Sequence, residues 1–85
     1  MIAPADQFGP WMPGLDAAEY RARLRCLRAV VRLSTGPRGE DLAGLLWRAE
    51  REPAALAPAL TALDRLAPID RRHVLANFAS LHRSA

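Results

Sequence analysis

The sequence has no lysine, and several other residue types are scarce. Its 85 residues include one cysteine, Cys26, two histidines and only 6% aromatic residues. A lone cysteine excludes an internal disulfide and is typical of a reducing compartment. No apolar run approaches the roughly 18 residues of a membrane-spanning helix, and the N-terminus has no secretion-signal pattern. We therefore expect a cytoplasmic protein that does not enter a membrane.

The residues needed for catalysis or metal binding are also few. His73 and His82 lie nine residues apart on one expected helix, so they point about 180° away from each other. A zinc site needs four ligands, which Cys26 and two divergent histidines do not supply. The glycines match no phosphate-binding loop, and such a loop needs a lysine. We expect no enzyme, no metal and no cofactor.

What the sequence does contain fits one small folded domain. The chain is 51% hydrophobic and 25% charged, with a formal net charge of +3, and such a composition is typical of globular proteins. A domain of this length buries a small core, so a partner subunit is a natural source of further stability. Only five valines and isoleucines are present, and no run of them alternates with period two, so we expect no sheet.

Residues 1–15 are expected to form an extended N-terminal arm, because they hold three of the seven prolines and two of the five glycines. The arm carries Trp11, and a purely solvated tail gains nothing from an exposed aromatic side chain. Two readings are open: the arm folds back over its own bundle, or Trp11 binds a partner.

Residues 16–85 are expected to form an all-α domain, a bundle of about four helices. Asp16 followed by Glu19 predicts the start of the first helix. Pro58 falls inside the third helical segment, so its regular part can begin at that proline. Cap residues and apolar periodicity predict helices over about 17–33, 40–51, 54–66 and 69–83.

Each expected helix has an apolar face that we assign to the core. These faces are Tyr20, Leu24, Leu27 and Val31; Leu42, Leu45, Leu46 and Ala49; Leu56, Leu60 and Leu63; and Val74, Leu75, Phe78 and Leu81.

A ladder of four arginines runs beside the core stripe of the first helix. Its members fall within a sector of about 60°, and they are Arg21, Arg25, Arg28 and Arg32. Like charges at this spacing repel unless solvent screens them or acidic groups pair with them, on Glu50 and Glu52 or on a partner. Phosphate is the other ligand that suits arginine.

A second apolar stripe of the same helix contains Cys26, Val30 and Leu33 and predicts either internal packing or self-association in a symmetric homodimer. Trp47 lies about 150° from the core face of the second helix, so it is expected to meet Trp11 or a partner.

The leading interpretation is a non-enzymatic adaptor or regulator that binds another protein, with Trp11, Trp47 and the arginine ladder as partner-binding residues. The alternative is a small DNA- or RNA-binding regulator. Its contacts would come from the ladder and from the outer face of the last helix, namely Arg71, Arg72, His73 and Asn77.

Overall fold

The chain folds into α-helices joined by short turns, and the predicted all-α class is confirmed. The computed structural model describes the backbone of residues 9–84 and the side chains of residues 9–81, and no strand occurs in that part of the chain. The elements in order are α1 (Ala17–Thr35), the 3-10 turn η1 (Gly36–Gly39), α2 (Glu40–Ala49), the 3-10 turn η2 (Pro53–Ala55), α3 (Leu56–Asp64) and α4 (Pro68–Ser84).

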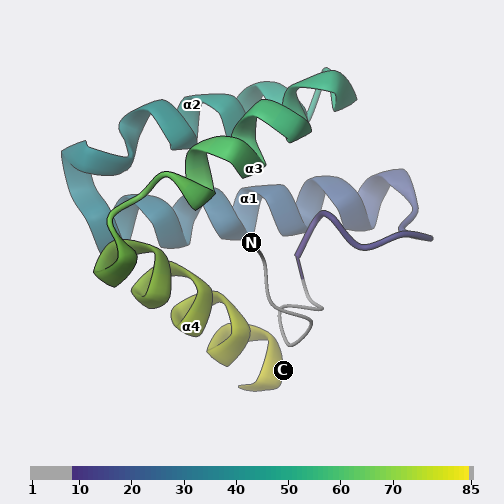
Figure 1. Ribbon diagram of the computed structural model, residues 1–85. Coiled ribbons are helices and arrows are strands. Elements are labelled where there is room, and N and C mark those ends of the chain that lie inside the picture. The colour runs from purple at the N-terminus through teal and green to yellow at the C-terminus, as the bar shows by residue number, and fades with distance from the viewer. Residues whose placement is uncertain (1–8, 85) are drawn as a thin grey trace.

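The expected bundle of about four helices is matched only in part. Three helices have ten residues or more, whereas α3 has nine. The chain reverses at η1, so α2 packs against α1, and α4 packs against α1 below it (Figure 1). The short α3 packs against α2. Helices α1 and α2 are therefore the central pair of the molecule.

The first helix begins as predicted and ends two residues later than predicted. The Asp16 carboxylate accepts a hydrogen bond of 2.8 Å from the Glu19 N–H, which satisfies one of the donors left open by the first turn. At the other end the helix continues through the buried Thr35, whose hydroxyl donates to the Val31 carbonyl at 2.7 Å. Gly36 then ends it with a φ of 58°, a conformation that favours glycine.

The second and third helices are shorter than predicted. Helix α2 ends at Ala49, and the N–H groups of residues 50–52 close a turn onto the last carbonyls of the helix. The third segment begins with the 3-10 turn at Pro53, and its α-helical part starts at Leu56 instead of at Pro58. Pro58 is accommodated because it lies in the first turn of α3, where backbone N–H groups have no partner within the helix.

A charged pair holds the start of α4 against η1. Arg38 donates two hydrogen bonds of 2.9 Å to the two carboxylate oxygens of Asp70, and Asp70 is 6% exposed. These hydrogen bonds, supported by the positive charge, lower the pKa of Asp70, although desolvation opposes them. The carboxylate also lies in the first turn of α4, where negative charge is favoured.

One buried cluster joins all four helices. Its members are Leu24, Leu27, Val30, Val31, Leu42, Ala43, Leu46, Ala49, Ala55, Ala59, Leu63, Val74 and Phe78. Most predicted core positions belong to it or pack against it. Leu81 is a correction: its side chain is 55% exposed, because it lies near the C-terminal end of α4.

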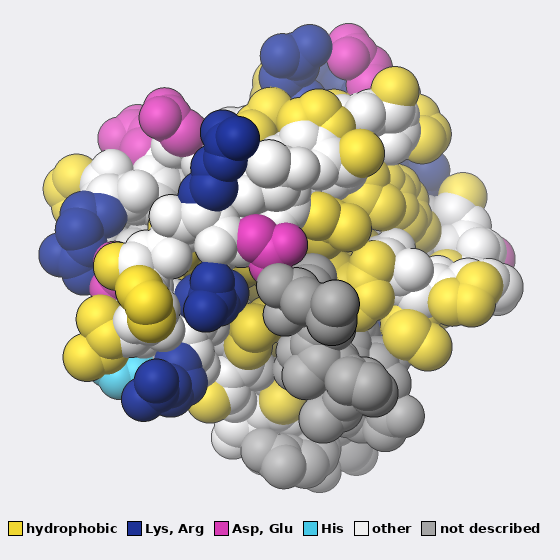
Figure 2. All heavy atoms as spheres, in the orientation of Figure 1, with side chains coloured by type: hydrophobic (Ala, Val, Ile, Leu, Met, Phe, Trp, Pro, Cys, Tyr) yellow, Lys and Arg dark blue, Asp and Glu magenta, His cyan; other side chains and the backbone are white. Residues whose placement is uncertain are grey.

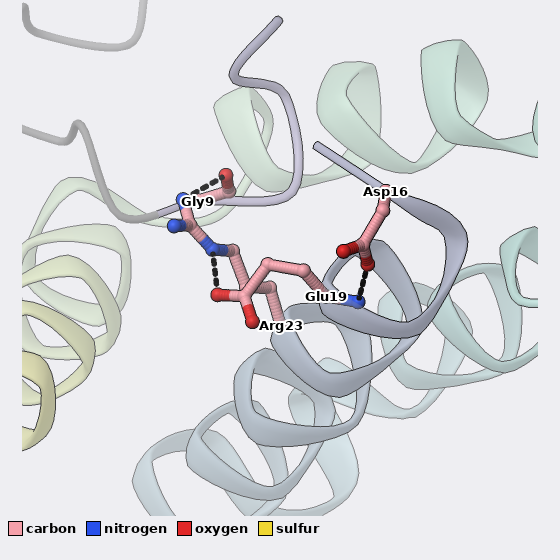
Figure 3. A network of polar contacts seen from close by, with 4 residues as sticks. All are labelled: Gly9, Asp16, Glu19 and Arg23. Carbon is pink, nitrogen blue, oxygen red and sulfur yellow. Dashed lines mark hydrogen bonds and ion pairs between the residues drawn. The ribbon is translucent and has the colours of Figure 1, made fainter. Parts of the chain in front are cut away.

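The predicted arm is described from residue 9 onward, and residues 1–8 lie outside the described part of the chain. Residues 9–14 form turns, with the Met12 N–H donating to the Gly9 carbonyl at 3.3 Å. Arg23 of α1 lies between the Glu19 carboxylate, at 2.9 Å, and the Gly9 carbonyl, at 3.3 Å (Figure 3). The α1 side chain Arg23 thus holds this segment against the helix.

Candidate interaction surface

The arginine ladder of α1 and a matching stripe of α2 line two neighbouring hollows that share lining residues. Two hollows, of about 590 Å³ and about 270 Å³, lie along the α1–α2 boundary, and both are lined by Arg28 and Trp47. We call this surface the Arg–Trp groove. Its defining residues are Arg21, Arg25, Arg28 and Arg32 from α1, and Glu40, Gly44, Trp47 and Arg51 from α2 and the turn after it.

The helical repeat explains why these residues face each other. The ladder occupies positions i, i+4, i+7 and i+11 of α1, and the opposite wall repeats the same spacing from Glu40 to Arg51. Residues at this spacing lie on one stripe of a helix. Because η1 reverses the chain, the two stripes run in opposite directions along the groove. The structure therefore brings Trp47 to the ladder, a juxtaposition that periodicity alone does not give.

The groove is electropositive. Five arginines and two glutamates line the two hollows, which gives a formal charge of +3. Glu50 and Glu52 were the two acidic residues expected to pair with the ladder. Glu50 does so, with Arg25 at 2.7 Å, whereas Glu52 pairs with Arg48 at 3.3 Å, outside the groove. The guanidinium groups of Arg21, Arg28 and Arg32 have no ion pair or hydrogen bond with any described residue.

Trp47 is the aromatic centre of the groove. Its side chain is 45% exposed, and the Arg51 guanidinium lies 4.5 Å from the ring centroid. This cation–π contact covers part of the ring and orients it. Tryptophan and arginine together are the residue types enriched at the energetic centres of protein interfaces.

Gly44 lies in the middle of α2 without a packing reason. A Cβ built at this position meets no other atom within 4 Å, so nothing in the fold requires glycine. Glycine in a helix interior costs about 0.5 to 1 kcal/mol relative to alanine. Its effect is to leave the wall of the groove open at the backbone of α2.

Trp11 is not part of this groove. Its ring packs on Phe78 of α4, with centroids 6.5 Å apart and ring planes inclined at 50°. Gly9 lies directly against the Trp11 ring, so closely that a Cβ there would collide with it. Trp11 therefore contacts the core of its own chain, and it does not meet Trp47.

The three predicted self-association residues lie in different environments. Val30 is 4% exposed and belongs to the core, so this chain covers it without a second one. Cys26 is partly buried, and burial raises the pKa of its thiol, which keeps it protonated. Only Leu33, at 89% exposure, is open to another molecule.

The predicted nucleic-acid residues of α4 are partly engaged within the chain. Arg71 donates to the Asp64 carbonyl at 2.8 Å, and the Asn77 amide donates to the Ser34 hydroxyl at 3.2 Å. Arg72 and His73 are exposed. On the face shown in Figure 2, which includes α4, basic side chains stand apart from one another instead of forming one patch.

Sequence reasoning missed Arg51, Gly44 and Glu40 as parts of the site. The sequence does show that these residues share one helical stripe with Trp47, at the spacing i, i+4, i+7 and i+11. That spacing does not reveal that the stripe faces the arginine ladder.

No group of three or more His, Cys, Asp or Glu side chains gathers as a metal site within the described residues. None of the described helices has the length and apolar character needed to cross a bilayer. Known protein families, curated proteins and solved structures give no match to this chain. The site is therefore interpreted from its own geometry.

Proposed function

We propose that this protein is a non-enzymatic docking module that binds another protein through the Arg–Trp groove. The observation that carries this proposal is the set of three guanidinium groups, of Arg21, Arg28 and Arg32, that pair with no described residue and lie beside the half-exposed Trp47. Repulsion along the ladder is offset when carboxylates of a partner bind to it. Gly44 supports the same function, because it lets a partner approach the backbone of α2.

The chemistry of the groove favours binding over catalysis. Its lining residues are arginine, glutamate, tryptophan, alanine, glycine and proline. Glu50 is held by Arg25 in a charged pair, and no candidate nucleophile lies beside a general base in the groove. Acid–base or covalent catalysis needs such a pair.

The proposal is tested by crosslinking at the rim of the groove. A diazirine-bearing amino acid replaces Glu40, and a matched control carries it at Ala57, which is exposed on α3. After irradiation of cells that make the protein, we expect position 40 to yield a protein adduct that survives nuclease and disappears with Trp47→Ala. Equal adducts from both positions, no adduct from position 40, or an adduct removed by nuclease would contradict the proposal.

A further inference from the structure

We infer that the partner presents an acidic amphipathic helix to the Arg–Trp groove. This inference rests on the proposed function and deepens it by naming the chemistry and shape of the partner. Three observations support it: the spacing of the ladder, the position of the two glutamates and the small residues of the α2 wall.

The spacing of the ladder matches a second helix. Its arginines are three or four residues apart, which at about 1.5 Å per residue places them about 4.5 to 6 Å apart along α1. A partner helix lying along the groove presents side chains at i, i+4, i+7 and i+11 with the same rise. An extended strand repeats its side chains every 6.6 Å or so on one face, and over three steps it runs about 3 Å out of register.

The glutamates of the groove favour a protein partner over a nucleic acid. Glu40 and Glu50 line the two hollows among the arginines. A phosphodiester backbone carries negative charge at every step, so it meets these carboxylates with repulsion. A helix can place a neutral or basic side chain opposite each of them and carboxylates opposite Arg21, Arg28 and Arg32. The mixture of positive and negative side chains in the groove therefore favours such a helix over a phosphate backbone.

The α2 wall favours an apolar stripe next to the carboxylates. Ala43, Gly44 and Pro37 contribute small or apolar surface beside Trp47. The missing Cβ at Gly44 leaves room for an aliphatic side chain of the partner to reach the helix backbone. A helix with one acidic stripe and one apolar stripe side by side complements both walls at once.

The test uses labelled, helix-stabilised peptides of about 16 residues and fluorescence anisotropy. Each peptide carries Glu at three of the positions i, i+4, i+7 and i+11 and Gln at the one opposite Arg25, which Glu50 already pairs. Leu follows each of these positions in one peptide and precedes each in the other, because the helix can lie in either direction. Controls are a peptide of the same composition with Glu and Leu on opposite faces, a proline-containing non-helical version, and a single-stranded oligonucleotide.

We expect one of the two helical designs to bind at least about tenfold more tightly than every control. The double variant Arg28→Gln, Arg32→Gln should weaken binding about tenfold, because each exposed ion pair contributes a factor of a few. Arg72→Gln on α4 is the matched control, since it removes an exposed arginine outside the groove and should leave binding unchanged. Circular dichroism verifies that each variant is folded.

The inference is overturned if the non-helical or rearranged peptide binds equally well, if the oligonucleotide binds more tightly, or if Arg72→Gln weakens binding as much as the groove variant. If no peptide binds while position 40 still crosslinks a protein, the docking function stands and the acidic helix is wrong. If neither peptide binding nor crosslinking occurs, both are wrong.

Discussion

At the residue scale, Asp70 and Gly44 have opposite effects on the stability of their own helices. Asp70 is buried and satisfied by Arg38, so it ties the first turn of α4 to η1. Gly44 does the opposite, because it weakens its own helix without any packing gain in the chain. The first residue serves the fold, and we assign the second to the groove.

The lowered pKa of Asp70 predicts acid sensitivity. Because the pKa is lower in the folded chain than in the unfolded chain, the Arg38 pair stabilises the fold fully above the ordinary pKa of aspartate, about 3.9. That stabilisation disappears as the pH falls through the lowered folded-state value. Arg38→Gln should therefore reduce stability in urea titrations at neutral pH, and the difference from wild type should shrink in strong acid.

Arg65→Gln is the control for this experiment, because Arg65 is exposed and makes no ion pair with a described residue. A constant difference between wild type and Arg38→Gln across the whole pH range would show that the Arg38–Asp70 pair is not responsible. High salt should also narrow the difference at neutral pH, since the Arg38 side chain is 68% exposed.

Gly44→Ala should stabilise the protein by about 0.5 to 1 kcal/mol, because alanine has the highest helix propensity and its Cβ would meet no neighbouring atom. Thermal unfolding measures this change, with Ala57→Gly as the reverse substitution at an exposed position of α3. Gly44→Ala should also bind a groove partner less tightly, since the added methyl group fills the space that glycine leaves in the α2 wall of the groove. A destabilised Gly44→Ala would show that the backbone there needs glycine.

At the element scale, the contact between α1 and α2 sets the geometry of the groove. The Tyr20 hydroxyl donates to the Ala49 carbonyl at 3.2 Å, and Arg25 pairs with Glu50 one residue further on. Both contacts tie the N-terminal half of α1 to the C-terminal end of α2. Burial also raises the pKa of Tyr20, so its hydroxyl remains a donor at neutral pH.

Tyr20→Phe should lower the free energy of unfolding by about 0.5 to 1.5 kcal/mol, the usual contribution of one hydrogen bond. Chemical denaturation of the variant measures this, and Tyr20→Leu adds the loss of ring packing for comparison. Wild-type stability in Tyr20→Phe would mean that the Ala49 carbonyl is satisfied equally well by solvent.

At the scale of the whole molecule, the central α1 has two open faces besides its core face. One is the arginine ladder, and the other carries Leu33 and Ala29, both exposed. Val30, which the sequence grouped with Leu33, is covered by the chain itself. A symmetric dimer stays a prediction, and Leu33 is now the residue that can be tested for it.

We expect sedimentation at micromolar concentrations to show a dimer that Leu33→Arg separates, because an unpaired charge in an apolar interface is costly. Leu81→Arg, at another exposed position, should leave the dimer intact. A monomeric wild-type protein would show that the dimer prediction is wrong. Val30→Arg is unsuitable for this test, since a charge in the core should unfold the domain.

The sequence by itself determined the helices and most of the core, because both depend on local signals. The Asp16 cap and the repeat of Leu24, Leu27 and Val31 depend on short-range hydrogen bonds and on the period of one helix. The ends of α2 and α3 were less well predicted, because Pro53 also permits the 3-10 turn that the chain adopts between them.

Only the tertiary structure decided which surfaces meet. Periodicity places residues around each helix axis, but it does not say which helix covers which stripe. For that reason Val30 and Leu33 looked alike in the sequence, whereas the fold buries one and exposes the other. The Arg–Trp groove likewise required the reversal at η1, which sets Trp47 and Gly44 opposite the ladder. A site shared by two helices depends on their packing, and packing is a property of the whole chain.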